Sequence, residues 1–188
     1  MKKIVIFFVA VAAVSIFYFD KTFALFFHSH HFTFFEPITT LGNAALWLVP
    51  SLLLWLLWRK SALKRAKKAL FVFGSVAISG IIVDILKPLI GRARPKELFY
   101  HNFYGLDPLT FKASFWSMPS GHSATAFAAG MSLALLYPRY RWLFFVAAAI
   151  VAFSRVALTK HYLSDIIIGS LIGALTALWL YKRMFDDQ

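Results

Sequence analysis

The chain alternates between long apolar runs and short polar segments. A helix needs about 20 residues to cross a bilayer, with a range of about 17 to 25, and several runs lie at the short end of that range. Flanking Trp, Tyr, Lys and Arg side chains extend short spans to the headgroups. The pattern therefore predicts an all-α, polytopic membrane protein with six transmembrane helices in a bundle, at residues 4–19, 42–58, 69–90, 120–137, 142–158 and 166–181.

The first apolar run has two interpretations. Lys2 and Lys3 precede a long apolar stretch, as they would in a cleaved signal peptide. The run continues through Phe17 and Tyr18 without a small-x-small cleavage site near its end, so we expect a retained helix. Cleavage would leave the topology of the other runs unchanged.

Two aromatic-rich segments lie between the runs. Residues 20–41 predict a helix or re-entrant piece in the outer membrane interface. Its histidines suggest a metal, but their spacing matches no zinc pattern and Glu36 is the only nearby carboxylate, so we predict no metal site. Residues 98–118 alternate aromatic and polar positions, which fits either interface anchors or a gate for a lipid tail. The histidines are His28, His30 and His31.

The composition supports a single membrane domain. The 188 residues are 60% hydrophobic, with a mean hydropathy of +0.70, whereas soluble domains are closer to half apolar. This length suits one domain over residues 1–188. The chain has no cysteine, which excludes disulfides and thiol catalysis.

The positive charge gathers at the ends of the apolar runs. The net charge is +12, but no basic face is interleaved with polar surface, so we expect no nucleic-acid partner. If the amino terminus lies inside, six crossings leave every basic cluster in the cytoplasm, as the positive-inside rule requires. Segments 20–41, 91–119 and 159–165 then face outside. The clusters are 2–3, 59–68, 139–141 and 182–183.

The first candidate site is Lys87 followed by Arg94 and Pro95, at the predicted outer end of the third run. An ammonium supplies a point charge to a phosphate, and a guanidinium supplies a forked pair of donors. Arg92 is a possible further contact. Asp84 lies three residues before Lys87 on the same helix face, so it either pairs with Lys87 or is bonded elsewhere; we expect a structural role.

The second candidate site is the sequence Pro-Ser-Gly-His at 119–122, directly before an apolar run. The free N–H groups of a helix amino terminus bind anions. Gly121 allows close approach of the backbone, and Ser120 either caps the helix or donates to a phosphate oxygen. His122 would then lie beside the bound anion, where it could act as an acid.

The third candidate site contains Ser154 and Arg155, followed by His161 and Asp165. His161 and Asp165 are four residues apart, so they share a face if this segment is helical. A carboxylate bonded to one imidazole nitrogen fixes the tautomer and leaves the other nitrogen free to attack. Two histidines, a carboxylate and three cations suffice for phosphoryl transfer without a metal.

Together the three sites resemble the motifs of the type 2 phosphatidic acid phosphatase (PAP2) superfamily. These are a lysine, six residues and Arg-Pro; then Pro-Ser-Gly-His; then Ser-Arg, five residues, a histidine, three residues and an aspartate. Every motif position is occupied between residues 87 and 165. The resemblance implies a metal-independent and cofactor-free lipid phosphatase with its active site at the outer face of the membrane.

The resemblance also implies roles for individual residues. His161 is expected to be the nucleophile that forms a phosphohistidine, with Asp165 orienting it. His122 is expected to protonate the leaving oxygen and then to activate water. The phosphate is expected to be held by Lys87, Arg94, Ser120, Gly121 and Arg155.

The predicted function is therefore hydrolysis of a lipid phosphate or diphosphate in a bacterial inner membrane, at an active site that faces the periplasm. The expected partners are the lipid substrate and the bilayer, with no obligate protein partner. Candidate substrates are undecaprenyl diphosphate, phosphatidylglycerol phosphate, phosphatidic acid and the 1-phosphate of lipid A. Two alternatives remain open: a lipid-to-lipid phosphotransferase of the same fold, and a transporter or scaffold that binds lipid phosphates without chemistry.

Overall fold

The computed structural model describes residues 2–30 and 32–186, and the secondary structure of these residues is helical apart from one isolated β-bridge between Arg92 and Leu106. The long helices are α1 (Lys2–Tyr18), α4 (Ala45–Trp58), α5 (Leu63–Ile90), α7 (Gly121–Leu136), α8 (Arg141–Ala157) and α9 (Leu163–Tyr181). Shorter ones are α2 (Asp20–His30), α3 (Phe35–Thr39) and α6 (Pro95–His101). Single turns occur at η1 (Thr40–Gly42), η2 (Ala113–Phe115), η3 (Pro138–Tyr140) and η4 (Lys182–Asp186).

Each of the six predicted apolar runs coincides with one of the long helices. The largest difference is in α5, which begins at Leu63 inside the basic segment rather than at residue 69. Lys and Arg are good helix formers, and their long side chains reach the headgroups from a continuing helix. The helix predicted within residues 20–41 is also present, as α2 and α3.

Three helical stretches of the described chain are long and apolar enough to cross a membrane: Leu63–Ile90, Pro138–Ala157 and Leu163–Phe185. Two further pairs of helices are each bent at a short break: α1 meets α2 at 63°, and Phe35–Gly42 meets α4 at 44°. If each pair is one span, the number of spans is five. Helix α7 has only 16 residues, below the usual spanning length. The chain is therefore a membrane protein, and a sixth crossing through α7 stays a prediction.

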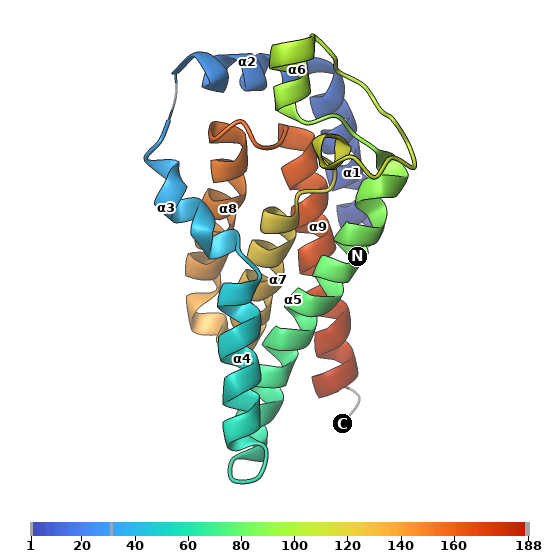
Figure 1. Ribbon diagram of the computed structural model, residues 1–188. Helices are drawn as coiled ribbons and strands as arrows, with labels where there is room; N and C mark the ends of the chain where they lie inside the picture. The colour runs from blue at the N-terminus through green and yellow to red at the C-terminus, as the bar shows by residue number, and fades with distance from the viewer. Residues whose placement is uncertain (1, 31, 187–188) are drawn as a thin grey trace.

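The two ends of the helix bundle differ in structure (Figure 1). The α4–α5 turn and the carboxyl-terminal end of α9 lie at one end, and α2 and α6 lie across the other. The basic clusters of residues 59–68 and 182–183 belong to the first of these ends. The segments that carry the motifs lie toward the opposite end, as the charge pattern predicts.

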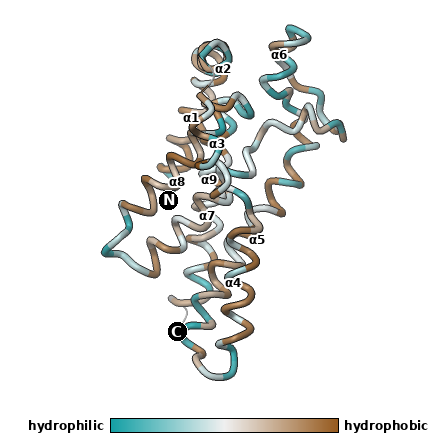
Figure 2. Tube along the Cα trace, turned by 60° about the vertical axis from the view of Figure 1, so that its left-hand side comes forward, coloured by the Kyte–Doolittle hydropathy of each residue, from teal (hydrophilic) through white to brown (hydrophobic). Residues whose placement is uncertain are grey.

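Large apolar side chains cover the outside of the bundle, and small residues fill its interior. Figure 2 shows the apolar stretches along α4 and α5 and the hydrophilic turn that joins these helices. Leu57 and Ile81 are 70% and 60% exposed, whereas Ala124 and Ala128 are fully buried. Membrane helices pack in this way, because lipid tails solvate large apolar groups as well as a protein core does.

Helices α7 and α9 approach each other most closely at two glycines. A Cβ atom at Gly169 would lie 2.4 Å from the carbonyl oxygen of Ser120, and one at Gly173 would lie 2.1 Å from that of Ala124. These two glycines, four residues apart, therefore form a small-x-x-x-small packing face within the monomer. It fixes the height of α9 against the amino terminus of α7.

Candidate active site

The turn after α5 brings the first motif to the amino terminus of α7. Gly91 ends α5 in the left-handed conformation, with φ of 59°, and a Cβ there would collide with the carbonyl of Asp107 at 1.7 Å. Lys87 lies in the last turn of α5, where its ammonium pairs with Asp84 at 2.8 Å. Of the two alternatives that the sequence left open for Asp84, the structure shows the pairing with Lys87.

Ser120 and Gly121 form the start of α7 beside Lys87. Ser120 is the N-cap, and its hydroxyl oxygen accepts from the backbone N–H of Ser123 at 3.4 Å. A Cβ on Gly121 would lie 3.4 Å from Nζ of Lys87. A glycine here keeps the space between the ammonium and the helix amino terminus open, and both groups attract anions.

His122 lies in the first turn of α7 and packs against η1. A Cβ atom on Gly42 would lie 2.8 Å from Cβ and 2.9 Å from Cδ2 of His122. Gly42 is buried, so only a residue without a side chain leaves the imidazole in this position. Lys87, Arg94 and Arg155 are all close enough to interact electrostatically with the ring.

The guanidinium groups of Arg94 and Arg155 have few protein partners. Arg94 donates to the carbonyl oxygen of Trp116 at 3.4 Å, and Arg155 donates to the hydroxyl of Thr39 at 2.8 Å. The Nε atom of each is buried without a hydrogen-bond partner, and within residues 2–30 and 32–186 neither has an ion pair with a carboxylate. Buried donors without acceptors are costly, and an anion would satisfy them.

His161 is held by a backbone carbonyl rather than directly by a carboxylate. Its Nδ1 lies 2.7 Å from the carbonyl oxygen of Ser117 and 3.6 Å from Oδ2 of Asp165. A carbonyl only accepts, so Nδ1 carries the proton and the lone pair is on Nε2. The condition for a shared helix face is not met, because α9 begins only at Leu163, after His161; the two side chains are nevertheless close.

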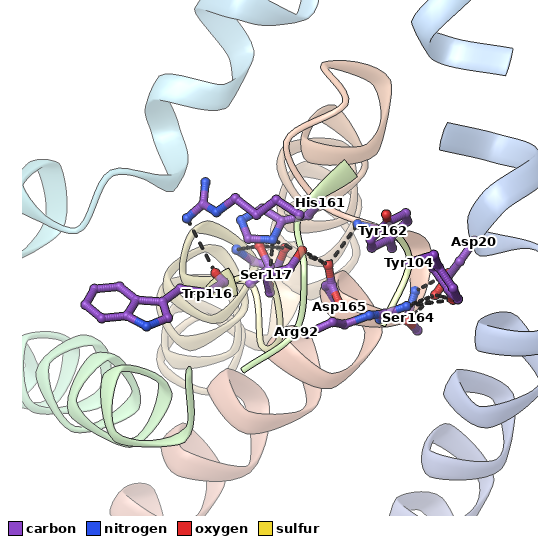
Figure 3. Close-up of polar contacts among 12 residues, drawn as sticks. Asp20, Arg92, Tyr104, Trp116, Ser117, His161, Tyr162, Ser164 and Asp165 are labelled. Carbon is purple, nitrogen blue, oxygen red and sulfur yellow. Dashed lines mark hydrogen bonds and ion pairs between the residues drawn. The ribbon is translucent and has the colours of Figure 1, made fainter. Parts of the chain in front are cut away.

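Asp165 is fully buried and acts as the hub of the hydrogen bonds around His161 (Figure 3). Its Oδ2 accepts from the hydroxyl of Ser117 at 2.6 Å and from the backbone N–H of Tyr162 at 2.9 Å. Its Oδ1 accepts from Arg92 at 2.6 Å. Ser117 therefore bridges the two motif residues, with its hydroxyl on Asp165 and its carbonyl on His161.

Arg92 is bound between two carboxylates and is not available to a phosphate. It donates to Asp165 and, at 2.7 Å, to Oδ2 of Asp20. Asp20 is 1% exposed and also accepts from the backbone N–H of Ser164 at 3.0 Å and from the hydroxyl of Ser15 at 2.9 Å. The suggestion that Arg92 contacts substrate is therefore replaced by a structural role.

Burial and neighbouring charges shift the pKa values of His161 and Arg92 in opposite directions. Burial lowers the pKa of His161 from its ordinary value, Asp165 partly reverses this, and Arg155 and Arg94 lower it again. Burial alone would lower the pKa of Arg92, but Asp165 and Asp20 outweigh it and raise the pKa above its ordinary value. The imidazole is thus neutral near pH 7, and the guanidinium stays charged.

All eight sequence-predicted site residues lie at the same end of the bundle, around the amino termini of α7 and α9 and the carboxyl ends of α5 and α8. Sequence reasoning missed Ser117 and Asp20, and it misassigned Arg92. One signal was available: Asp20 is a carboxylate directly after an apolar run, and such a residue needs a partner. Nothing in the spacing identified Arg92 as that partner, 72 residues away.

The described residues contain no group of three or more His, Cys, Asp or Glu side chains arranged to hold a metal ion. In the histidine-rich segment, His28 stacks on Phe99 with ring centroids 3.9 Å apart. Nδ1 of His30 lies 2.8 Å from the carbonyl oxygen of Phe26. His31, the third histidine of that segment, lies outside the described residues.

Comparison with known proteins points to one family. The family model of the PAP2 superfamily matches residues 68–188, more than half of the chain. The lipid A 1-phosphatase of Rhizobium etli is 34% identical in an alignment of 151 residues that covers 73% of this chain and 65% of that protein. The lipid A 4'-phosphatase of Porphyromonas gingivalis is 30% identical in an alignment of 130 residues that covers 63% of this chain and 53% of that protein.

The matched part of the chain thus spans less than two thirds of the length of these relatives. A crystal structure of a transmembrane PAP2-type phosphatidylglycerolphosphate phosphatase from Bacillus subtilis superposes with a TM-score of 0.70 at 22% identity. The superposition covers 98% of this chain and 94% of that one. The helical fold is therefore shared over nearly the whole length of both chains.

Proposed function

The chain belongs to the PAP2 superfamily, and from this we propose that it is an integral membrane phosphatase that releases phosphate from a lipid phosphate or diphosphate. The similar lipid A phosphatases support a lipid substrate. One observation carries the proposal: the half-buried guanidinium groups of Arg94 and Arg155 each have a buried Nε without a hydrogen-bond partner and lie near His161, whose Nδ1 is hydrogen-bonded to a carbonyl oxygen. The arrangement offers an anion site beside a nucleophilic nitrogen.

In the first step, Nε2 of His161 attacks phosphorus, and the bond from phosphorus to the leaving oxygen breaks. His122 donates its proton to that oxygen. The imidazole of His161 becomes cationic as the nitrogen–phosphorus bond forms, and Asp165 and the carbonyl of Ser117 stabilise that charge.

In the second step, a water attacks the phosphohistidine, and His122 takes a proton from it. The nitrogen–phosphorus bond breaks, which releases inorganic phosphate and regenerates neutral His161. No metal or cofactor is required, since positioning and fixed positive charge supply most of the stabilisation in phosphoryl transfer.

The transferring phosphate would lie between the amino terminus of α7 and the guanidinium groups of Arg94 and Arg155. Lys87 and the backbone N–H of Gly121 are on one side of this space, with Nζ 3.4 Å from the position of a Gly121 Cβ. Arg94 and Arg155 provide forked donors. The hydroxyl oxygen of Ser120 accepts from the hydroxyl of Ser123 at 2.9 Å and from its backbone N–H at 3.4 Å, so it caps α7, while its own O–H can donate to a phosphate oxygen.

The location that fits the chain is a bacterial inner membrane, with the single domain of residues 1–188 placing its active site on the periplasmic side. The basic clusters of residues 59–68 and 182–183 lie at the opposite end of the bundle from α2 and α6, which supports this orientation. The candidate substrates remain undecaprenyl diphosphate, phosphatidylglycerol phosphate, phosphatidic acid and the 1-phosphate of lipid A.

The direct test is phosphate release by purified protein from these lipids, in detergent with EDTA, beside His161→Ala and His122→Ala. We expect turnover by the wild type, a fall of at least about 10³-fold in His161→Ala and of about 10² to 10⁴-fold in His122→Ala. Both variants should still insert into membranes. Substantial activity in His161→Ala, or loss of wild-type activity in EDTA, would contradict the mechanism.

A wild-type protein that releases no phosphate is then assayed with paired donor and acceptor lipids. Transfer between lipids would identify the phosphotransferase alternative. Binding of lipid phosphate without either reaction would identify a transporter or scaffold.

A further inference from the structure

A second positively charged cavity opens directly beside the proposed phosphate site. It has a volume of about 450 Å³ and is lined by α2, α6 and the α8–α9 turn. Arg94 belongs to both this cavity and the phosphate site, and Lys160 immediately precedes His161. The cavity is large enough for part of a polar headgroup, because small-molecule pockets measure about 300–1,000 Å³.

The charge of this cavity is one-sided. Arg94, Lys96 and Lys160 line it, and no carboxylate does. The acidic neighbour of Lys96 in the chain, Glu97, lies 3.9 Å from His101 instead. Within the described part of the chain, neither lysine has an ion pair. Lys96 and Lys160 are exposed and Arg94 is half-buried, and three cations around one space without a counter-ion attract an anion.

The backbone that presents Lys160 is strained. Thr159 has φ of 53°, a conformation that β-branched residues rarely adopt. The N–H groups of Lys160 and His161 both donate to the carbonyl oxygen of Arg155, at 2.9 and 3.2 Å. This turn places one lysine at the cavity and the next residue, the proposed nucleophile, in the site. Strain of this kind gathers at functional sites.

Aromatic contacts hold the two outer helices together over the cavity. The ring of Phe99 in α6 stacks on His28 in α2, with an angle of 14° between their planes, and both residues line the cavity. Figure 1 shows α2 and α6 side by side at the end of the bundle that carries the site. The cavity is therefore bounded by fixed elements and not by a single loop.

We propose that this cavity is a subsite for a second phosphate group on the same lipid headgroup, bound by Lys96 and Lys160 while Arg94 and Arg155 hold the phosphate that is transferred. The inference rests on the proposed function. It makes lipids with two phosphate groups the preferred substrates over lipids with one. The second phosphate is either joined to the first, as in a diphosphate, or carried elsewhere on the headgroup.

The test measures kcat/KM for two substrate pairs, farnesyl diphosphate with farnesyl monophosphate, and bisphosphorylated lipid A with its monophosphorylated form. Wild type is compared with the double variant Lys96→Gln, Lys160→Gln. We expect the preference for the doubly phosphorylated member of one pair to fall by about tenfold or more, since contacts between charged groups are strong. A reduced preference in the farnesyl pair would mean that the second phosphate is joined to the first. A reduced preference in the lipid A pair would mean that it is carried elsewhere on the headgroup.

Lys112→Gln is the matched control, because Lys112 is an exposed lysine of the same outer segment that does not line the cavity. It should leave both preferences unchanged. If the double variant loses kcat/KM equally for both members of each pair, and added salt reduces that loss, the lysines act by general electrostatic steering. This result would overturn the proposal. Unchanged preferences in the double variant would overturn it as well. A wild type inactive on all four lipids but active on phosphatidic acid or phosphatidylglycerol phosphate would overturn the subsite alone. A wild type inactive on those two lipids as well would refute the phosphatase function itself.

Discussion

At the scale of single residues, the tautomer of His161 is set by the carbonyl oxygen of Ser117, 2.7 Å from Nδ1. The carboxylate of Asp165 lies farther away, at 3.6 Å, and binds the hydroxyl of the same serine. A backbone carbonyl cannot change its protonation state, so this contact keeps the lone pair on Nε2 at any pH where the ring is neutral.

The pH dependence of activity should reflect the buried position of His161. Burial lowers its pKa below the ordinary 6.5, so the nucleophilic neutral form persists to lower pH than in an exposed histidine. We therefore expect the acidic limb of kcat/KM to have an apparent pKa below 6.5. Ionisation of the substrate phosphate also produces an acidic limb. Measuring kcat/KM with substrates whose phosphates have different pKa values identifies it, because only the limb due to the lipid then moves. An enzymatic limb at or above 6.5 would contradict the assignment.

Asp20 should affect the rate although it touches no substrate. With Asp20 and Asp165 on either side of Arg92, the three groups carry one net negative charge, which favours the cationic imidazole that forms during attack. Asp20→Asn keeps the shape and removes that charge, but its NH2 group replaces one acceptor oxygen, so kcat is compared at equal amounts of folded protein. We expect kcat to fall by about tenfold, or ~1.4 kcal/mol, with KM nearly unchanged.

Asp20→Ala serves as the comparison, because it also leaves Arg92 and the N–H of Ser164 without acceptors. Breaking a buried ion pair destabilises a protein by about 3–5 kcal/mol, so this variant should lose folded protein in addition to rate. Equal kcat in wild type and Asp20→Asn would show that Asp20 serves the fold alone.

At the scale of elements, the packing of α9 against α7 sets the position of the phosphate site. Gly169→Ala would place a methyl group 2.4 Å from the carbonyl oxygen of Ser120, so the helices must separate. We expect a loss of about 1–3 kcal/mol, seen as a melting temperature lower by about 2–12 °C in detergent, together with reduced activity. Gly80→Ala is the control, because a Cβ there meets nothing within 4 Å.

At the scale of the whole molecule, orientation can be tested directly because the chain contains no cysteine. Two single-cysteine variants are made at exposed positions: Ser61→Cys in the α4–α5 turn, and Lys112→Cys in the segment between α6 and α7. In intact bacterial cells, a membrane-impermeant maleimide should label Lys112→Cys at once and Ser61→Cys only after permeabilisation. The reverse pattern would place the site in the cytoplasm.

The sequence by itself determined the helices and the motif residues. The apolar runs marked six helices, because each segment is solvated by lipid independently of the others. The pairing of Lys87 with Asp84 was one of two alternatives from the sequence, since residues three apart on a helix are neighbours, and the structure selected it. The eight site residues followed from their resemblance to a family pattern, and their roles stay predictions.

Only the tertiary structure decided which groups hold those residues. The contact of Gly42 with His122, the carbonyl of Ser117 on His161 and the pairing of Asp20 with Arg92 each join elements far apart in the chain. Such contacts leave no periodic signal, because they depend on how whole helices pack and not on the spacing within one. The cavity lined by Lys96 and Lys160 arises in the same way, where α2, α6 and the α8–α9 turn meet.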